Sequence, residues 1–230
     1  MSRPLFVLGK FFGVIVAIGV AYWALSAVFL LNVRHEVMQT ASNRPDIPVI
    51  AFGLGALFLA AVGSALANYF YHWVFPSTFV GAMTLLMTLA WCLVLVISKD
   101  WQFQSPMADL KPQILLGLLL VFYALMILVA VALAASTKLG QVMTLLICFG
   151  VFLIGLVNDG ILGRKAENTA WIAAIYYAIP NIQLLWPADA ITQGHDFSTS
   201  YIAYATGYSV LYTAAVLSIA IALFQTREVG

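Results

Sequence analysis

The chain has 230 residues, of which 63% are hydrophobic and 8% are charged. Soluble domains are about half apolar and about a quarter charged, so a water-soluble globule is excluded and lipid must cover most of the surface. The net charge of +1 comes from scattered Lys and Arg residues, which excludes the concentrated basic surface of a nucleic-acid-binding protein.

The first uncharged run begins close to the N-terminus. Arg3 and Lys10 precede an apolar stretch that continues to Asn32, which is longer than the roughly 7–15 residues of a signal-peptide core. A helix needs about 20 apolar residues to cross a hydrocarbon core of roughly 30 Å. We therefore predict an uncleaved membrane span over residues 8–31.

The next uncharged run, residues 47–98, is long enough for two spans joined by a tight turn. Pro76 breaks the helical pattern, and aromatic and half-polar residues typical of a membrane interface surround it: Tyr69, Tyr71, His72 and Trp73. We predict spans over residues 48–70 and 77–98. Small residues recur along one side of the first of these spans, which favours close packing within the chain: Gly53, Ala56, Ala60, Gly63 and Ala67.

Two more spans follow a polar loop at residues 99–111. We predict them over residues 112–135 and 139–157, with a short turn around Lys138 between them. Cys92 and Cys148 each lie inside an apolar run, and no second Cys or His stands at metal-ligand spacing. This pattern indicates neither a disulfide nor a metal site.

Residues 158–200 differ from the rest of the chain. Residues 168–188 are uncharged, but polar residues and prolines interrupt them: Pro180, Asn181, Gln183 and Pro187. Because a broken helix survives at membrane depth only where protein or water shelters it, we predict short interfacial or re-entrant helices there, before a last span over residues 200–224. The predicted fold is an all-α polytopic transmembrane bundle of about six spans, one domain over residues 1–230.

Few polar groups fall within or next to the predicted spans. Asn68 and Asp159 lie at span ends, where an interfacial role is favoured. Tyr204, Tyr208 and Tyr212 share a face of the last span, and Tyr212 lies well below the interface. A hydroxyl at that depth needs a partner, so we expect either a hydrogen bond to a neighbouring helix or the wall of an amphiphilic translocation path.

Motifs for nucleotide binding or catalysis are missing from the sequence. Gly9-Lys10 lacks the upstream glycine of a phosphate-binding loop, and neither Gly-x-Ser-x-Gly nor His-Glu-x-x-His occurs. Carriers driven by protons or sodium normally need a carboxylate in mid-membrane, and the predicted spans offer none. We expect no catalytic residue, cofactor or metal in this chain, and a source of energy outside it.

Four short stretches carry a family resemblance. They are Ser2 to Gly13 at the start, Leu223 to Val229 at the end, and the triplets Ile179-Pro180-Asn181 and Asp189-Ala190-Ile191. Together they resemble exporter-type (type-2) ABC transporter permease subunits at the entry to a span, at the close of the last span and in the short extracytoplasmic helices before it. The family normally has further spans before the Gly-Lys stretch; a second subunit would supply them, or the reading frame is a fragment.

The resemblance implies a permease subunit that forms the translocation path of an ATP-driven exporter. An ABC ATPase subunit would hydrolyse ATP, and a second permease chain, identical or different, would complete the path in a bacterial inner membrane. It implies cytoplasmic termini, with Arg3, Lys10 and Arg227 nearest the ATPase, although the distribution of Lys and Arg mildly opposes that orientation. A self-contained carrier or channel and a non-transporting membrane scaffold remain the alternatives.

Overall fold

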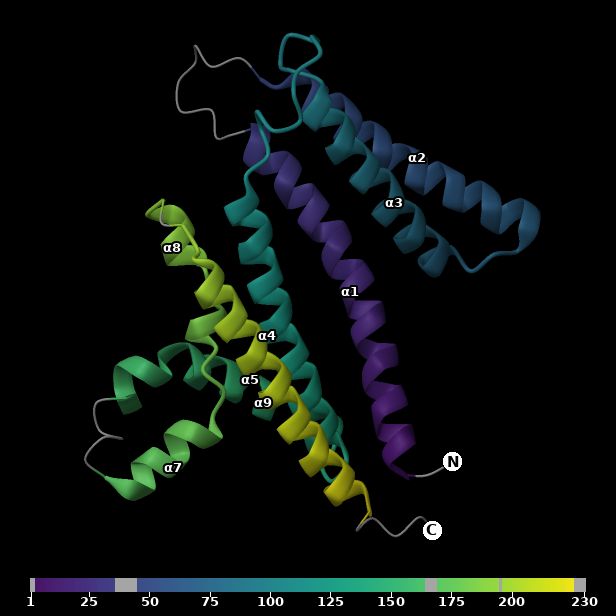
Figure 1. Ribbon diagram of the computed structural model, residues 1–230. Helices are drawn as coiled ribbons and strands as arrows, with labels where there is room; N and C mark the ends of the chain where they lie inside the picture. The colour runs from purple at the N-terminus through teal and green to yellow at the C-terminus, as the bar shows by residue number, and fades with distance from the viewer. Residues whose placement is uncertain (1–2, 36–44, 164–168, 195, 226–230) are drawn as a thin grey trace. The chain divides into compact units, whose positions relative to one another are not determined.

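The structure is a computed structural model, and it describes residues 3–163, 169–194 and 196–225 except for residues 36–44 (Figure 1). In these ranges the chain is helical, apart from turns and one isolated antiparallel bridge between Ile97 and Phe103. Six of the described helices are long and apolar enough to cross a membrane. This confirms the predicted all-α polytopic fold, and the chain is an integral membrane protein.

The six long helices follow the uncharged runs of the sequence. They are α1 (Arg3–His35), α2 (Ile47–Tyr71), α3 (Phe75–Val96), α4 (Pro112–Ser136), α5 (Gln141–Asn158) and α9 (Thr199–Gln225). The first helix extends beyond the predicted span 8–31 at both ends. Its last turn carries Arg34 and His35, where a positive charge is favourable beside the carboxyl end of a helix.

The turn between α2 and α3 is as tight as the sequence predicts. His72 ends α2 in the left-handed conformation, with φ of 58°, and its backbone N–H bonds back to the end of the helix. Pro76 lies in the first turn of α3, where the missing N–H of proline costs no helical hydrogen bond. The side chain of Asn68 donates to the carbonyl oxygen of Trp73 over 2.6 Å and closes the turn.

The chain divides into two compact units. Unit 1 comprises Met1–Ile15 and Pro112–Gly230, and unit 2 comprises Val16–Lys111, so that α1 contributes its first part to one unit and the remainder to the other. In unit 2, the end of α1 packs with α2 and α3 around a core of Ala27, Leu31, Val49, Ala56, Met87, Ala90 and Val94. Part of the small-residue stripe, Ala56 and Ala60, is buried there, whereas Gly63 faces open space.

Two hydrophobic clusters hold unit 1 together. One joins the start of α1 to the end of α4 and to α9: Val7, Phe11, Ile15, Ala130, Leu133, Ala134, Leu217 and Ala220. The other joins α4 and α9 to the segment between α7 and α8: Leu120, Ala124, Ile127, Ile182, Leu185 and Ala205. Buried Ile182 and Leu185 therefore fix the segment between α7 and α8 against two spanning helices.

Short helical pieces occupy the region before the last span. They are the π-helical turn η1 (Asp159–Gly163), α7 (Ala170–Ala178), the 3₁₀ turn η2 (Gln183–Leu185) and α8 (Ala188–Thr192). Pro180 and Pro187 interrupt the series, because proline disfavours helical conformation in the residue before it. The short helices predicted around residues 168–188 are therefore present.

Candidate functional site

Polar side chains from α5, η1, α7 and α9 meet in unit 1. We call this group the polar cluster, and it consists of Asn158, Asp159, Tyr176, Asn181, Tyr208 and Tyr212. It forms where α5 gives way to η1 and where the chain leaves α7. Figure 1 shows α7 beside α9 within this unit rather than beyond the start of α9.

The carboxylate of Asp159 is held by two hydrogen-bond donors. Its Oδ1 accepts from the hydroxyl of Tyr176 over 2.6 Å, and its Oδ2 accepts from Nδ2 of Asn181 over 2.8 Å. Within the described ranges no cation forms an ion pair with this exposed carboxylate, since the ion pairs found there belong to Arg34. The hydrogen bond to Asp159 raises the pKa of Tyr176 to about 12, so Tyr176 remains a donor at neutral pH.

Asn181 links the end of α5 to α9. Its backbone N–H donates to the hydroxyl oxygen of Tyr208 over 2.7 Å, while its side-chain NH₂ donates to Asp159. Its side-chain oxygen accepts from the backbone N–H of Leu184 over 3.1 Å and shapes the turn that follows. Three polar groups of one residue thus hold the interrupted segment, and replacement would disturb all three contacts.

Tyrosines on one face of α9 satisfy the backbone of this segment. The hydroxyl of Tyr212 donates to the carbonyl oxygen of Ala178 over 2.8 Å, and that of Tyr201 donates to the carbonyl oxygen of Leu184. Since Tyr201 and Tyr212 are 11 positions apart, the segment 178–184 follows α9 over roughly 16 Å. Carbonyl groups that lack helical partners are therefore paired with side chains rather than left to water.

A glycine lets the segment approach α5 closely. A Cβ atom at Gly155 would lie 2.6 Å from Cγ1 of Ile182 and 2.6 Å from the carbonyl oxygen of Pro180. The backbone N–H of Ile182 donates to the carbonyl oxygen of Gly155 over 3.0 Å. Only glycine permits this backbone-to-backbone contact, which fixes the height of Asn181 beside Asp159.

Asn158 is the most deeply buried member of the polar cluster. Its Nδ2 donates to the carbonyl oxygen of Tyr176 over 3.1 Å, and the residue is 1% exposed. Its Oδ1 is buried and has no hydrogen-bond partner among the described residues. A buried acceptor without a donor is costly, so this oxygen suits a water molecule or the donor group of a ligand.

The polar cluster lies beside the middle of α9. Tyr208 and Tyr212 stand 9 and 13 residues after Thr199, or about 14 and 20 Å along a helix about 40 Å long. The polar cluster can bind a positively charged or hydrogen-donating group, because Asp159 and Asn158 present acceptor oxygens next to tyrosine rings.

The structure brings three of the sequence-predicted site residues together and separates two. Asp159, Tyr208 and Tyr212 belong to the polar cluster. Tyr204, one helical turn before Tyr208, is 65% exposed. Asn68 lies in unit 2, where it closes the α2–α3 turn.

Sequence reasoning did not single out three members of the polar cluster as site residues: Asn158, Tyr176 and Asn181. A usable signal was the run Ile179-Pro180-Asn181, which places a polar residue directly after a helix break in an apolar segment. Asn158 was visible only as the neighbour of Asp159. Tyr176 gave no signal, since an aromatic residue in a short apolar helix is ordinary.

One of the three predicted ATPase-facing residues has a described side chain. Lys10 is exposed on α1 and borders a small recess of about 40 Å³ with Phe6, Thr137 and Phe224. The rings of Phe6 and Phe224 stack with centroids 5.6 Å apart, which brings the start of α1 to the end of α9. Arg227 and the side chain of Arg3 lie outside the described residues.

A second polar feature, in unit 2, is an ion-pair network formed by Arg34, Asp46 and Asp109. Nε of Arg34 lies 3.2 Å from Oδ2 of Asp46 and 3.2 Å from Oδ2 of Asp109. Its Nη2 donates to the carbonyl oxygen of Ile97 over 2.6 Å. Asp46 also caps α2 by accepting from the backbone N–H of Val49. The network thus ties together the ends of three helices, which is a structural role.

No protein-family model, no curated protein and no solved structure matches the chain. The functional proposal therefore rests on the residues of this chain and not on a related protein.

Proposed function

We propose that the chain is the membrane-spanning permease subunit of an ATP-driven exporter of the type-2 ABC class. A separate ABC ATPase subunit hydrolyses ATP, and a second permease chain, identical or different, completes the translocation path. The six spans, the resemblance at both ends of the sequence and the lack of a phosphate-binding loop in it support this proposal.

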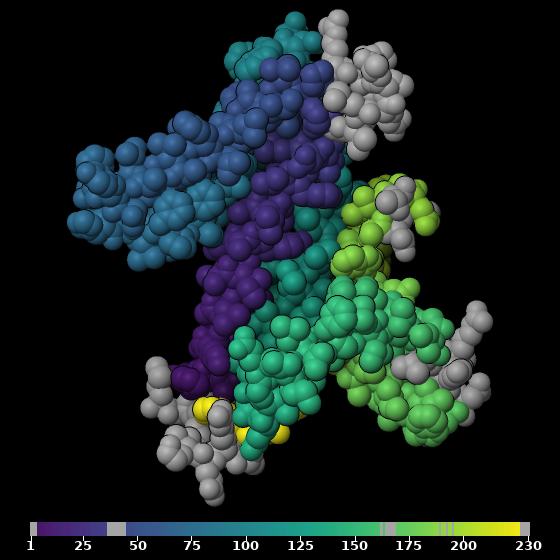
Figure 2. Space-filling model, turned by 180° about the vertical axis from the view of Figure 1, so that it is seen from behind, coloured from purple at the N-terminus to yellow at the C-terminus, as the bar shows by residue number. Residues whose placement is uncertain are grey.

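The observation that carries the proposal is the convergence of three chain segments at one end of unit 1. The start of α1, the turn after α4 and the end of α9 share the recess lined by Phe6, Thr137 and Phe224. Figure 2 shows the purple start of α1, the green start of α5 and the yellow end of α9 gathered at this end. A permease with cytoplasmic termini would present these segments to its ATPase.

The charges at this end are favourable for such docking. Lys10 and Lys138 are both exposed there, and the sequence adds Arg3 and Arg227 at the adjoining ends of α1 and α9. Exposed cations at this end attract an acidic partner surface, and this attraction supports docking although the distribution of Lys and Arg over the whole sequence mildly opposes cytoplasmic termini. In this proposal the two termini are cytoplasmic and the recess end faces the ATPase.

The polar cluster supplies part of the translocation path in this proposal. Asp159 is an exposed carboxylate linked through Asn181 to Tyr208, about a third of the way along the membrane-spanning helix α9, and it has no cationic partner in the described ranges. A charge at that depth is costly unless water, a substrate or a partner chain faces it. The second permease chain would enclose this surface.

Charge reversal at the two ends of α4 tests the docking face. Lys138 follows α4 and Lys111 precedes it, so the two exposed lysines stand about 37 Å apart along one 25-residue helix. Affinity purification of the tagged chain from native membranes should recover an ABC ATPase. Lys138→Glu should reduce that recovery several-fold, and Lys111→Glu should leave it unchanged.

Two results would overturn the proposal. One is repeated purification without any ATPase. The other is equal recovery with Lys138→Glu, Lys10→Glu and Lys111→Glu, which would show that the recess end does not face the partner.

A second candidate function, a self-contained carrier, is favoured by the position of Asp159. The structure ties this carboxylate through Asn181 to Tyr208, about 14 Å along α9 from its start. Such a group can carry a coupling ion. The purified chain in vesicles would then show ion flux without ATP, and Asp159→Asn would abolish it.

A further inference from the structure

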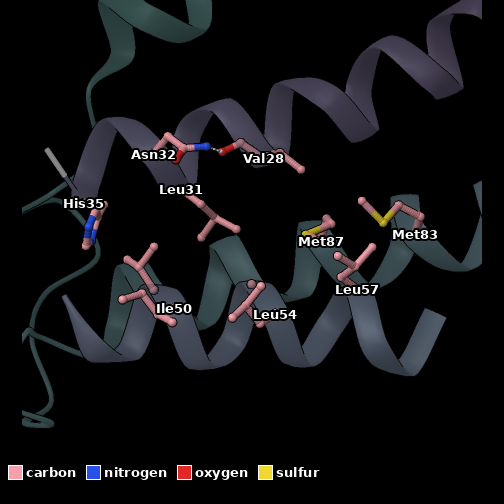
Figure 3. A pocket seen from close by; sticks show the side chains of 11 residues that line it. Val28, Leu31, Asn32, His35, Ile50, Leu54, Leu57, Met83 and Met87 are labelled. Carbon is pink, nitrogen blue, oxygen red and sulfur yellow. Dashed lines mark hydrogen bonds between the residues drawn. The ribbon is translucent and has the colours of Figure 1, made fainter. Parts of the chain in front are cut away.

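An open groove runs between α1, α2 and α3 in unit 2 (Figure 3). Its volume is about 400 Å³, within the roughly 300–1,000 Å³ range of small-molecule sites. Its walls are apolar and include two flexible methionines: Leu31, Ile50, Leu54, Leu57, Met83 and Met87. Methionine adapts to irregular apolar ligands because its side chain is unbranched and flexible.

One end of the groove is polar. Asn32 and His35 line this end, as Figure 3 shows, whereas Leu57 and Met83 line the opposite end. The backbone N–H of Asp46 donates to Nδ1 of His35 over 3.3 Å, which places the proton of a neutral imidazole on Nε2. The polar end therefore offers an N–H donor.

The polar end coincides with the ends of spanning helices. His35 is the last residue of α1, and Ile50 stands in the first turn of α2. Nearby, Trp101 packs against Phe52 of α2 with ring centroids 5.9 Å apart, and Phe103 is 89% exposed in the same loop. Exposed aromatic residues at span ends are typical of the membrane interface. The groove thus begins at the interface and continues to Leu57, about 10 Å deeper along α2.

We propose that this groove binds one acyl chain of a membrane glycerolipid, and that a lipid ester or phosphate oxygen accepts a hydrogen bond from Nε2 of His35. The polarity of the groove matches that of a lipid placed with its polar part at the interface and its chain in the hydrocarbon. This binding is independent of the ATPase and holds for any function of the chain.

The size of the groove argues against a helix of a partner chain as its occupant. A helix with its side chains is about 10 Å across, so a length of 10 Å occupies on the order of 800 Å³, about twice the groove. A single flexible acyl chain is much narrower. A segment of another protein is therefore the competing occupant that the experiment must exclude.

The charges near the polar end indicate which part of the lipid is recognised. Arg34 is already paired with Asp46 and Asp109. The described residues there carry no net positive charge, because the carboxylates balance the cations: Asp46, Asp100 and Asp109 against Arg34, Lys99 and Lys111. Recognition therefore uses the acceptor oxygens common to glycerolipids and does not select an anionic headgroup. Phosphatidylcholine and phosphatidylglycerol should bind equally well.

Photo-crosslinking tests the proposal with the full chain in vesicles of phosphatidylcholine and phosphatidylglycerol. A trace of phosphatidylcholine carries a diazirine in its acyl chain, and the crosslinked peptides are mapped by mass spectrometry. We expect crosslinks at the groove residues of α2 and α3, in particular Met83 and Met87.

Filling the groove should remove those crosslinks. A Cβ at Gly53 would meet only Cδ1 of Leu31, at 3.6 Å, so Gly53→Phe should be accommodated by filling the groove. Gly63→Phe is the matched control, because Gly63 lies on the same helix, outside the groove and in open space. Leu54→Trp, at an exposed lining residue, and its control Leu59→Trp repeat the test without altering a glycine. Both groove variants should lower the crosslink yield at least five-fold.

The donor at His35 has a test of its own. His35→Ala should lower the crosslink yield several-fold, and His35→Gln, whose side chain retains an N–H donor, should restore most of it.

Three outcomes would overturn the proposal. Equal crosslink yields from the groove variants and their controls would show that the crosslinks come from the general lipid shell and not from a lipid in the groove. Equal crosslink yields from His35→Ala and wild type would show that Nε2–H of His35 does not contribute to lipid binding. A protein segment crosslinked into the groove in native membranes would identify a different occupant.

Discussion

The polar cluster of unit 1 and the ion-pair network of unit 2 both join helix ends, but they treat charge differently. In the network, the guanidinium of Arg34 lies between two carboxylates, and Asp46 is fully buried. In the polar cluster, Asp159 has two neutral donors and no cationic partner among the described residues. One site is closed on itself, and the other presents an exposed carboxylate.

This difference assigns the two sites to different tasks. A buried ion pair fixes the geometry of its surroundings, and Arg34 is paired with both carboxylates although its Nη1 has no hydrogen-bond partner among the described residues. An exposed carboxylate beside a spanning helix, below its end, is costly unless something polar faces it. Substitutions should therefore cost most stability in the network, whereas those that remove a single contact of the polar cluster should cost less.

Arg34→Met should have the largest effect on stability. It leaves Asp46 buried without a counter-charge, which costs about 3–5 kcal/mol. Thermal unfolding of the purified chain in detergent measures the loss. Adding Asp46→Asn should recover much of it, because asparagine removes the charge and still caps α2. An unchanged unfolding temperature for Arg34→Met would contradict the structural role of the network.

Gly155→Ala should have the next largest effect. The new Cβ would clash with Ile182 and with the carbonyl oxygen of Pro180, and overpacking of this kind costs about 1–3 kcal/mol. Gly150→Ala on the same helix meets no atom within 4 Å and is the matched control. Equal unfolding temperatures for the two variants would show that the segment does not approach α5 as closely as described.

Tyr212→Phe should cost roughly 1 kcal/mol, since it removes the donor to the carbonyl oxygen of Ala178. Tyr204→Phe, at an exposed position one turn before Tyr208, should change stability by less than half of that. Denaturant unfolding of the two variants side by side provides the comparison. A larger loss for Tyr204→Phe would reverse the roles of the two tyrosines.

The smallest effect concerns pH. The pKa of Tyr176 is raised from 10.0 to about 12, so the stabilisation from its hydrogen bond to Asp159 is complete below about pH 10 and is lost as the pH rises through about 12. Tyr176→Phe should lower the stability by the same amount at every pH between 7 and 9, where this hydrogen bond is complete, and should abolish the loss of stability as the pH rises through about 12. Absorbance of tyrosinate during alkaline titration of wild type and variant measures the pKa of Tyr176. A tyrosinate signal near pH 10 that disappears in Tyr176→Phe would contradict the raised pKa.

The sequence predicts the spans well and the site only in part. Uncharged runs locate the six long helices because hydrocarbon excludes charge, and Pro180 and Pro187 locate the helix breaks for steric reasons. The position of Asp159 is harder to predict, because its depth depends on contact with Asn181, 22 positions away. The pairing of Arg34 with Asp109 spans 75 positions and leaves no periodic signal in the sequence.

The most direct test of a water-accessible path at the polar cluster is labelling by a membrane-impermeant thiol reagent in native membranes. Cys92 and Cys148 are first replaced by alanine, and single cysteines are placed at Asp159 and at Ile154, an exposed α5 residue. We predict rapid labelling at position 159 and none at 154, because water reaches the first and lipid covers the second. No labelling at position 159, or equal labelling at both positions, would contradict the proposed path.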